Sequence, residues 1–324
     1  MMRRLENCRP SSSRHGSGSG GGRRTGMSSE RPDLPLAIEF RDVSIEFDGL
    51  PVLQSISFQL EQGDMLCVTG DSRAGKSVLL RLAIGFLQPD RGEVLIDGNS
   101  LAEMTEVELL SLRRERMGMV FQENALFTGQ SVFDNAAYRL TERDWPDEQV
   151  EAAVLEVLTF VGLQDDQEKQ AEELSGGMKR RLEFARALIG WPSIMLFDEP
   201  TSGLDPINAR QVLDLIVRAR DLHQIASLFV TKSMHEIPYL ATHQATRDER
   251  GEVRIERVEK VDRLRVMVLE EGRVAFFGTP GDLQQSMLPA VRHLLRPVSQ
   301  PDNLHFECSD PWRNTRERVD EAGN

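Results

Sequence analysis

The sequence has no long apolar run, few cysteines and no overall excess of positive charge. Its most apolar stretches, “MLCVTG” and “SIMLFDE”, have the length of a β-strand. A membrane-spanning helix needs about 20 consecutive apolar residues. Any membrane role is therefore expected to come through a partner.

Only three cysteines occur in the 324 residues, Cys8, Cys67 and Cys308, and they lie far apart without metal-ligand spacing. Cys67 falls in a predicted buried strand and the other two in predicted tails. The pattern favours a reducing compartment such as the cytosol.

A net positive charge is found at the N-terminus and not in the rest of the chain taken as a whole. The formal net charge is −13, and because residues 1–26 hold six arginines against one glutamate, the remainder carries −18. Binding to nucleic acid requires clustered positive charge. We therefore expect no nucleic-acid partner for the folded part.

Residues 1–34 contain “SSSRHGSGSGGGRRTG” and are predicted to form a disordered tail, because they have little apolar surface to bury. A transit peptide is the alternative, but the glycine run gives no amphipathic helix. Met27 is a candidate for the true start.

The pattern after the tail indicates an α/β fold. “LAIEFRDVSIEF” and “SISFQL” alternate apolar and polar residues, which predicts two strands. “MLCVTG” is typical of a strand buried on both faces of a parallel sheet, and “KSVLLRLAIGFL” predicts a helix. Strand, loop and helix in this order are the start of a βαβ unit.

One large domain is predicted over residues 35–282, with a helical insert at about 123–175 and a C-terminal extension at 283–324. A further helix is predicted from near Gly176, strands at “SIMLFDEP” and “ASLFVTK”, and a hairpin at “RVMVLEEGRVAFFGTP”. The charged stretch at about 241–262 predicts an added hairpin or loop, either a solvated embellishment or a docking surface.

Residues 70–77, “GDSRAGKS”, fit the phosphate-binding pattern G-x-x-x-x-G-K-[ST] between a predicted strand and a helix. Backbone N–H groups of such a loop surround phosphate oxygens, Lys76 reaches the β and γ phosphates, and Ser77 ligates Mg²⁺. An ordinary glycine-rich turn is the alternative.

Two carboxylates end another apolar strand in “IMLFDEPTSGLDP”. Asp198 can hold Mg²⁺ through water, and Glu199 can polarise an attacking water. A helix-capping pair is the alternative, but the phosphate loop upstream favours the catalytic interpretation.

At residues 174–181, “LSGGMKRR”, the sequence resembles the nucleotide-binding subunits of ABC transporters. The resemblance extends over residues 36–282, with an aromatic at Phe47, the P-loop, a Q-loop glutamine at Gln122, the signature, the Asp198–Glu199 pair and “SGLDP” as the D-loop, in family order. It implies a P-loop ATPase core with a parallel sheet, an N-terminal antiparallel β subdomain and a helical insert.

In that family the signature of one subunit closes over the ATP held by another, so Ser175 and Gly177 would contact a γ-phosphate in trans. A helix that begins with “SGG” is by itself a second anion site, and a serine N-cap on a surface helix is the alternative. Two half-sites imply a head-to-tail pair of chains, with ATP between them.

The resemblance implies ATP and Mg²⁺ as cofactors and assigns a role to each matching residue. Glu199, Gln122 and Lys232 are expected to be catalytic, and Ser77, Gln122 and Asp198 to be the Mg²⁺ ligands. The expected ATP-binding residues are Phe47, Gly70, Asp71, Ser72, Arg73, Ala74, Gly75, Lys76, Ser77, Val78, Ser175, Gly176, Gly177 and Asp205.

Two positions depart from the family pattern. Arg73 stands where the P-loop usually has glycine, so we expect a negative φ and a side chain that points outward or onto an acidic partner. Lys232 in “FVTKSMHEI” replaces the switch histidine at the start of an expected helix. Losing one preorganised group costs on the order of 10² to 10³ in rate, which predicts a slow ATPase. His235 is either a substitute for that histidine or a solvated residue.

The signature with Met178, “ALFTGQSVFDNAAYRL” and “DEPTSGLDP” are similar to the ATPases of Mla- or Mce-type lipid transport systems. This resemblance implies an ATP-hydrolysing motor subunit on the cytosolic face of the inner membrane. Its expected partners are a permease, whose coupling helix would bind the helical insert, a second, identical ATP-binding subunit and a lipid-binding shuttle protein. The alternative is a regulatory ABC protein that dimerises on ATP with weak hydrolysis.

Overall fold

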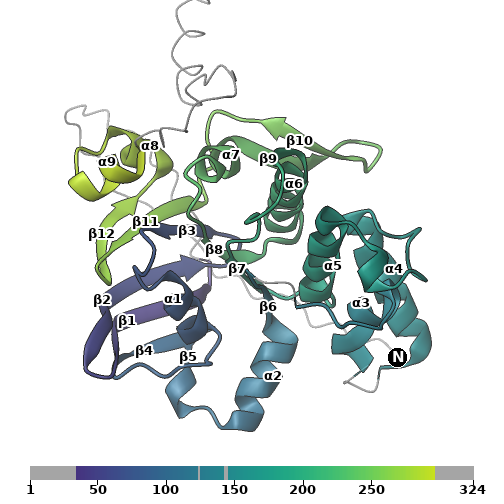
Figure 1. Cartoon of the computed structure of the whole chain (residues 1–324), viewed down its shortest axis with the longest axis horizontal. Helices are drawn as coiled ribbons and strands as arrows, with labels where there is room; N and C mark the ends of the chain where they lie inside the picture. The colour runs from purple at the N-terminus through teal and green to yellow at the C-terminus, as the bar shows by residue number, and fades with distance from the viewer. Residues whose placement is uncertain (1–33, 123–124, 142–144, 296–324) are drawn as a thin grey trace, which may run out of the picture. The chain divides into compact units, whose positions relative to one another are not determined.

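The computed structural model describes residues 34–295 apart from 123–124 and 142–144 (Figure 1). The predicted N-terminal tail lies outside the described residues except for Leu34, and the C-terminal extension is described as far as Leu295. The first half of the elements is β1 (Leu36–Phe47), β2 (Leu50–Glu61), β3 (Met65–Gly70), α1 (Lys76–Ala83), β4 (Arg91–Ile96), β5 (Asn99–Ser100), the 3-10 helix η1 (Leu101–Glu103), α2 (Glu106–Arg116), β6 (Met117–Val120), α3 (Val132–Thr141) and α4 (Asp147–Val161). The second half is the 3-10 helix η2 (Ala171–Glu173), α5 (Gly176–Leu188), β7 (Ile194–Asp198), α6 (Pro206–His223), β8 (Ala226–Val230), α7 (Glu236–Thr242), β9 (His243–Arg247), β10 (Val253–Arg257), β11 (Leu264–Glu270), β12 (Arg273–Gly278), α8 (Pro280–Gln285) and α9 (Pro289–Leu295).

A six-stranded sheet forms the centre, in the order β12-β11-β3-β8-β7-β6. All neighbours pair in parallel except β11 and β12. Every residue of β3, β7 and β8 is buried, as their continuous apolar sequences predict. Since parallel strands end at the same edge of a sheet, the residues that follow Gly70, Asp198 and Val230 meet there.

Each face of this sheet has its own hydrophobic core, because side chains alternate along a strand. On β3, Leu66 and Val68 pack with β1, β2, β4 and α1, whereas Met65 and Cys67 pack with α3, α4, α5 and α6. The antiparallel sheet β2-β1-β4-β5 covers the first face. The fold class predicted from the sequence is confirmed.

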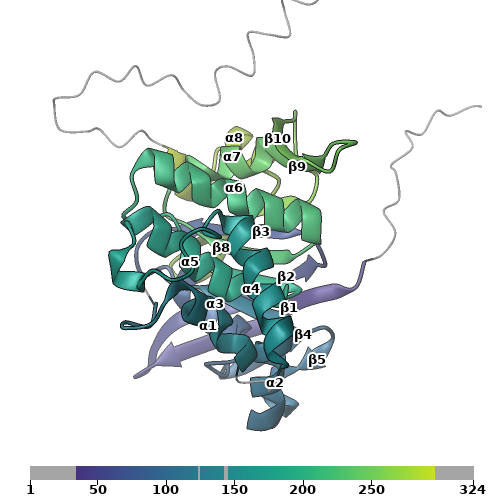
Figure 2. The ribbon, with the colours of Figure 1, turned by 90° about the vertical axis from the view of Figure 1, so that its right-hand side faces the viewer.

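Helices α3, α4 and α5 pack on one another beside strand β6 (Figures 1 and 2). They supply Val154, Leu158 and Leu182 to the core. This cluster follows the segment after β6, and α5 carries the predicted signature turn at its first residues.

The charged stretch contains an antiparallel pair of strands, β9 and β10. It is attached to α6, where the buried Arg220 donates to the carbonyl of His243 at 2.8 Å and Asp221 Oδ2 accepts from the amide of Ala245 at 2.8 Å.

Among the described residues, no helix has the length and apolar character needed to cross a membrane.

Candidate nucleotide-binding and catalytic site

The phosphate loop runs from the end of β3 to the first turn of α1. Gly75 adopts φ 93°, and a Cβ there would lie 2.5 Å from Leu53 Cδ2 and 3.0 Å from Val52 O, so only glycine fits. The Lys76 ammonium is buried and donates at 2.7 Å to the carbonyls of Gly70 and Asp71. Burial lowers the pKa of Lys76. The loop thus carries a positive charge at a helix N-terminus, which suits phosphate.

Ser77 and Asp198 are brought together from different elements. Ser77 Oγ on α1 donates to Asp198 Oδ1 at the end of β7, at 3.3 Å. Burial raises the pKa of Asp198, so a nearby cation would favour its ionised form. The helix-capping alternative for Asp198 does not apply, because Asp205 is the residue that caps α6.

A hydroxyl and a carboxylate are the hard oxygen ligands that Mg²⁺ prefers, and this ion usually takes one or two protein ligands together with phosphates and waters. The part of the chain that the structure describes has no cluster of three or more His, Cys, Asp or Glu side chains able to hold a metal by itself. Ser77 and Asp198 therefore fit Mg²⁺ that arrives with a nucleotide.

Glu199 follows directly, and its backbone is turned at φ 47°. Its amide donates to the carbonyl of Val230 at 3.0 Å, and its buried carboxylate forms an ion pair with Lys232, Oε1 to Nζ 2.7 Å. Lys232 is half exposed, at 48%. The predicted catalytic carboxylate and Lys232, the predicted switch residue, are thus direct partners.

A second link between the same two segments was missed from the sequence. Glu236 at the start of α7 is buried and accepts a hydrogen bond from the hydroxyl of Thr201. Burial raises the pKa of Glu236. An acidic residue that opens the otherwise apolar “EIPYLA” was the available signal.

The expectation for the backbone of Arg73 is wrong. Arg73 has φ 75°, in the left-handed region, although its side chain is exposed as expected. The loop keeps the backbone path that a glycine would take, because its two ends are fixed by β3 and by Gly75 against Leu53. Arg73 therefore bears conformational strain.

The helix expected from Lys232 begins later, at Glu236. Pro238 explains the delay, since proline is accepted in the first turn of a helix and not in its interior. The hydroxyl of Thr231 also accepts from the amide of Ser233 at 2.8 Å, which forms a local turn instead. His235 precedes the helix and is exposed, which agrees with the solvated alternative.

The predicted signature turn opens α5. Ser175 is the N-cap, and its hydroxyl accepts from the amide of Met178 at 3.3 Å, so the capping alternative describes its own contacts. Gly177 lies against α6, where a Cβ would be 1.9 Å from Asn208 Oδ1. Asn208 in turn donates to Asp205, whose pKa is lowered chiefly by that bond. The predicted signature is therefore linked to Asp205 of the predicted D-loop through Asn208 of the same chain.

Phe47 and Gln122 stand apart from these contacts. Phe47 is 42% exposed at the end of β1. Gln122 is exposed as well, and its backbone carbonyl accepts from Arg180 Nη2 at 2.9 Å. The structure gives no contact between the Gln122 side chain and Ser77 or Asp198, so its Mg²⁺ role remains a prediction.

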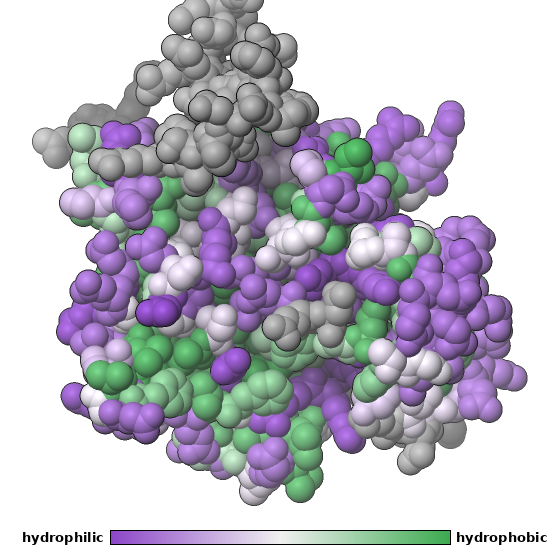
Figure 3. All heavy atoms as spheres, viewed as in Figure 1, coloured by the Kyte–Doolittle hydropathy of each residue, from purple (hydrophilic) through white to green (hydrophobic). Residues whose placement is uncertain are grey.

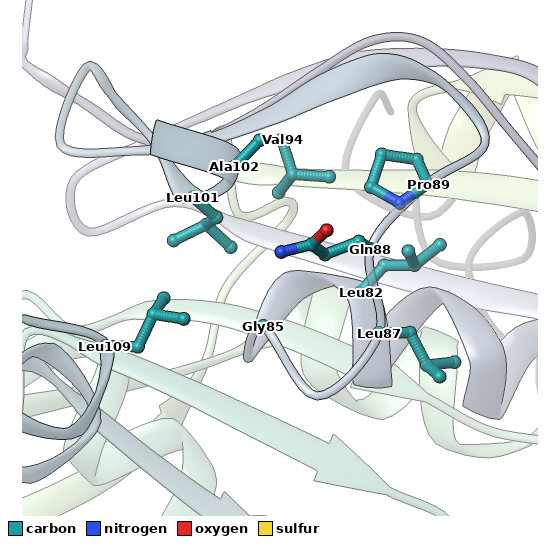
Figure 4. Close-up of a pocket in the computed structure, with 9 residues that line it drawn as sticks. All are labelled: Leu82, Gly85, Leu87, Gln88, Pro89, Val94, Leu101, Ala102 and Leu109. Carbon is teal, nitrogen blue, oxygen red and sulfur yellow. The ribbon is translucent and has the colours of Figure 1, made fainter. Parts of the chain in front are cut away.

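A pocket elsewhere on the domain has a different character. It lies between α1, β4, η1 and α2 and is lined by Leu82, Gly85, Leu87, Gln88, Pro89, Val94, Leu101, Ala102 and Leu109 (Figure 4). Gln88 is its one polar lining side chain. Apolar side chains also gather on this face of the molecule (Figure 3). Without a charged group in its lining, this pocket does not suit a nucleotide phosphate.

The fold and the site together define a P-loop nucleotide-binding domain. A family model described as “ABC transporter” matches residues 53–202. Among solved structures, cbiO1 of Clostridium perfringens aligns with a TM-score of 0.66 at 24% identity, covering 81% of this chain and 99% of its own. That likeness supports the fold.

Curated relatives carry the comparison further. The methionine import ATP-binding protein MetN of Carboxydothermus hydrogenoformans is 36% identical over 65% of this chain and 63% of its own length. Protein TRIGALACTOSYLDIACYLGLYCEROL 3, chloroplastic, of Arabidopsis thaliana is 37% identical over 82% and 76%, respectively. The intermembrane phospholipid transport system ATP-binding protein MlaF of Haemophilus influenzae is 35% identical over 64% and 78%.

This chain therefore belongs to the ABC transporter family and carries its ATP-binding domain. It spans less than two thirds of the length of the MetN relative. The family inferred from the order of the motifs is confirmed. The narrower resemblance to Mla-type ATPases is one of several, because the relatives are named for methionine import as well as for phospholipid transport.

Proposed function

We propose that this chain binds and hydrolyses ATP as the motor subunit of an ABC transporter. The observation that carries the proposal is the meeting of three elements at one edge of the sheet. Ser77 of the P-loop helix lies 3.3 Å from Asp198, and Glu199 follows with its carboxylate buried beside Lys232. This edge of the sheet thus has Lys76 for the phosphates, Ser77 and Asp198 for the metal and Glu199 for the attacking water.

Each residue then has a defined task. Bound Mg²⁺ would supply positive charge to the phosphate oxygens, and Ser77 and Asp198 would hold it. Lys76 would add its charge to the β and γ phosphates, in place of the two loop carbonyls it now contacts. Glu199 would orient the attacking water and accept its proton.

Lys232 makes this hydrolysis slow in the proposal. Its ammonium lies 2.7 Å from Glu199 Oε1, so this oxygen is occupied by the ion pair until Lys232 turns toward the phosphates. A lysine also lacks the flat ring and the directed hydrogen bonds of histidine. ATP binding is preserved because the charge is preserved, and the cost is in the rate.

Steady-state ATP hydrolysis by the purified full chain, alone and with its permease, tests the proposal. Glu199→Gln should lower kcat by about 10² or more, and Lys232→His should raise it by about 10-fold or more. Lys260→His is the matched control, because Lys260 lies in the charged insertion and pairs only with Asp262 at the surface among the described residues. If Glu199→Gln hydrolyses ATP like the unchanged chain, this site is not the hydrolytic one.

The transported substrate is proposed to be a phospholipid or related lipid. The signature with Met178 and the name of the MlaF relative support this, and the MetN relatives support methionine instead. In the proposal two copies act with a permease on the cytosolic face of the inner membrane, and a lipid-binding shuttle delivers or removes the lipid. When the chain is reconstituted in vesicles with a permease encoded next to its gene, ATP hydrolysis should drive the movement of a fluorescent phospholipid and not of radiolabelled methionine.

A regulatory ABC protein that dimerises on ATP is the second candidate. The Lys232–Glu199 pair favours it, because weak hydrolysis would prolong the ATP-bound dimer. Co-purification of the chain with a multi-spanning membrane protein would support the transporter proposal. A chain that dimerises on ATP and binds no such protein would support the regulatory candidate.

A further inference from the structure

Helix α5 contains a buried ion pair that the proposed chemistry does not use. Arg180 Nη1 lies 2.8 Å from Glu183 Oε2, and the two side chains are only 5% and 4% exposed. Removing charges from water is costly, and a buried pair is often no more stable than well-packed apolar side chains. Stability therefore gives no sufficient reason for the pair, and its other contacts show what it does.

Those contacts all reach the segment that follows β6 and carries Gln122. Arg180 Nη1 donates to the carbonyl of Phe121 at 2.7 Å, and Nη2 donates to the carbonyl of Gln122 at 2.9 Å. Glu183 Oε1 accepts from the amide of Ala125 at 3.0 Å. One pair of side chains thus binds this segment on both sides of its predicted metal ligand.

The same segment is fixed a second time by α3. Asn135, fully buried, accepts from the amide of Phe127 at 2.8 Å and donates to the carbonyl of Phe127 at 3.1 Å. The described residues Phe121, Gln122, Ala125 and Phe127 are thus each bonded through their backbone to a side chain of α5 or α3.

The pair also lies within two turns of the signature. Ser175 is the N-cap of α5, and Arg180 is five residues farther along the same helix. A rigid helix passes any displacement of its first turn directly to the Arg180 guanidinium. The Gln122 carbonyl is bonded to that guanidinium and must follow it.

We propose that Arg180 and Glu183 are positioning residues that couple the Gln122 segment, which serves the ATP of its own chain, to the signature turn, which serves the ATP of a second chain, so that the two move as one body. This rests on the proposed ATPase function. The pair acts through Gln122 and contacts neither nucleotide nor metal itself.

The test replaces both charges at once, Arg180→Met with Glu183→Leu, to avoid leaving one charge buried alone. Arg181→Met is the matched control, since Arg181 is the next residue of α5 and donates to the carbonyls of Val161 and Gly162, at 2.9 and 3.1 Å, at the end of α4. Hydrogen–deuterium exchange without nucleotide should become at least 10-fold faster at the Ala125 amide in the double variant, and should be unchanged there in the control.

The coupling is measured through Mg²⁺. In the double variant, the Mg²⁺ concentration for half-maximal ATP hydrolysis should rise at least five-fold while the KM for ATP changes less than two-fold. In a Gln122→Ala background the same double change should have no further effect on Mg²⁺. Arg180→Lys keeps the positive charge but loses the two donor nitrogens of the guanidinium, so its Mg²⁺ requirement should lie between those of the unchanged chain and the double variant.

The proposal is overturned by unchanged exchange at Ala125, or by faster exchange with an unchanged Mg²⁺ requirement. A fall in thermal stability alone, without either change, shows a purely structural pair and overturns it too. If the unchanged chain hydrolyses no ATP, the proposed function has failed. In that case the exchange at Ala125 still decides whether the pair holds the segment, and the Mg²⁺ requirement for ATP binding, measured by calorimetry, replaces the kinetic readout for the coupling.

Discussion

Replacing Gly177 with alanine should destabilise the domain, whereas the same change at Gly176 should not. A Cβ at Gly177 would lie 1.9 Å from Asn208 Oδ1 and 2.4 Å from Asn208 Cγ, but a Cβ at Gly176 would meet no atom within 4 Å. Both glycines open α5. The two substitutions therefore have nearly the same effect on helix propensity and differ in the atoms that surround the new Cβ.

The expected magnitude follows from two opposing effects. Alanine in place of glycine stabilises a helix by about 0.5–1 kcal/mol, and by less in its first turn. Overpacking costs about 1–3 kcal/mol. We expect Gly177→Ala to lower the free energy of unfolding by roughly 1–2 kcal/mol, which is a few degrees in Tm at this chain length. Gly176→Ala should be neutral or stabilising by up to about 1 kcal/mol.

Urea and thermal unfolding of the two variants measure this difference, and Asn208→Ala completes a double-mutant cycle. In the Asn208→Ala background the clash is gone, so Gly177→Ala should no longer destabilise. Equal stabilities of the Gly176 and Gly177 variants would refute the reasoning.

The same cycle separates packing from nucleotide contact. If Gly177 also contacts a γ-phosphate of a second chain, the Gly177→Ala, Asn208→Ala protein will regain stability without regaining ATP-driven dimerisation. Sedimentation in a Glu199→Gln background, where bound ATP persists in the proposal, measures that dimer. A double variant that recovers both properties would restrict Gly177 to a packing role.

Two further predictions concern strain and buried charge. Arg73→Gly should raise Tm by a few degrees, because a non-glycine residue in the left-handed region costs on the order of 1–3 kcal/mol, whereas the extra freedom of glycine in the unfolded chain lowers stability by only about 0.5–1 kcal/mol. The control Arg91→Gly, at an exposed strand position of ordinary φ, should lower Tm. A lower Tm in both variants would contradict the strain at Arg73. Burial raises the pKa of Glu236 in the folded protein. The stability that Glu236 contributes is therefore fully present below the pKa of this group in the unfolded chain and is lost as pH rises through its pKa in the folded protein. Glu236→Gln should consequently stabilise the protein increasingly, relative to the unchanged chain, as pH rises. A difference in Tm between Glu236→Gln and the unchanged chain that is flat from pH 5 to about 8 would contradict a buried acid that titrates.

The backbone positions of the site were predictable because they depend on where strands end. “MLCVTG” and “SIMLFDE” are apolar throughout, and a run of that kind has to be buried on both faces of a parallel sheet. Parallel strands end at one edge, so Gly70 and Asp198 were bound to approach each other. The observed contact of Ser77 with Asp198 follows from this topology.

The side-chain partners were not predictable by the same reasoning. Lys232 reaches Glu199 because the backbone of Glu199 turns at φ 47°, and no sequence pattern requires that value. The burial of the Arg180–Glu183 pair could not be predicted, since spacing alone does not tell which face of a helix the neighbouring segment covers. The late start of α7 could have been predicted from Pro238, which fits only the first turn.

The lysine at position 232 bears on transport and on switching in the same way. In the proposed function, the Lys232 ammonium would attract the phosphates of bound ATP as strongly as those of the transition state, and an interaction equal in both states improves binding without accelerating the chemical step. The ion pair with Glu199 would add to this, because it occupies Glu199 Oε1 whenever Lys232 does not contact phosphate. In the proposed function, both effects would lengthen the time that ATP holds two chains together. The chain would then differ from other family members in the lifetime of its ATP-bound state rather than in the location of its site, and a permease or a regulatory partner would depend on the same slow step.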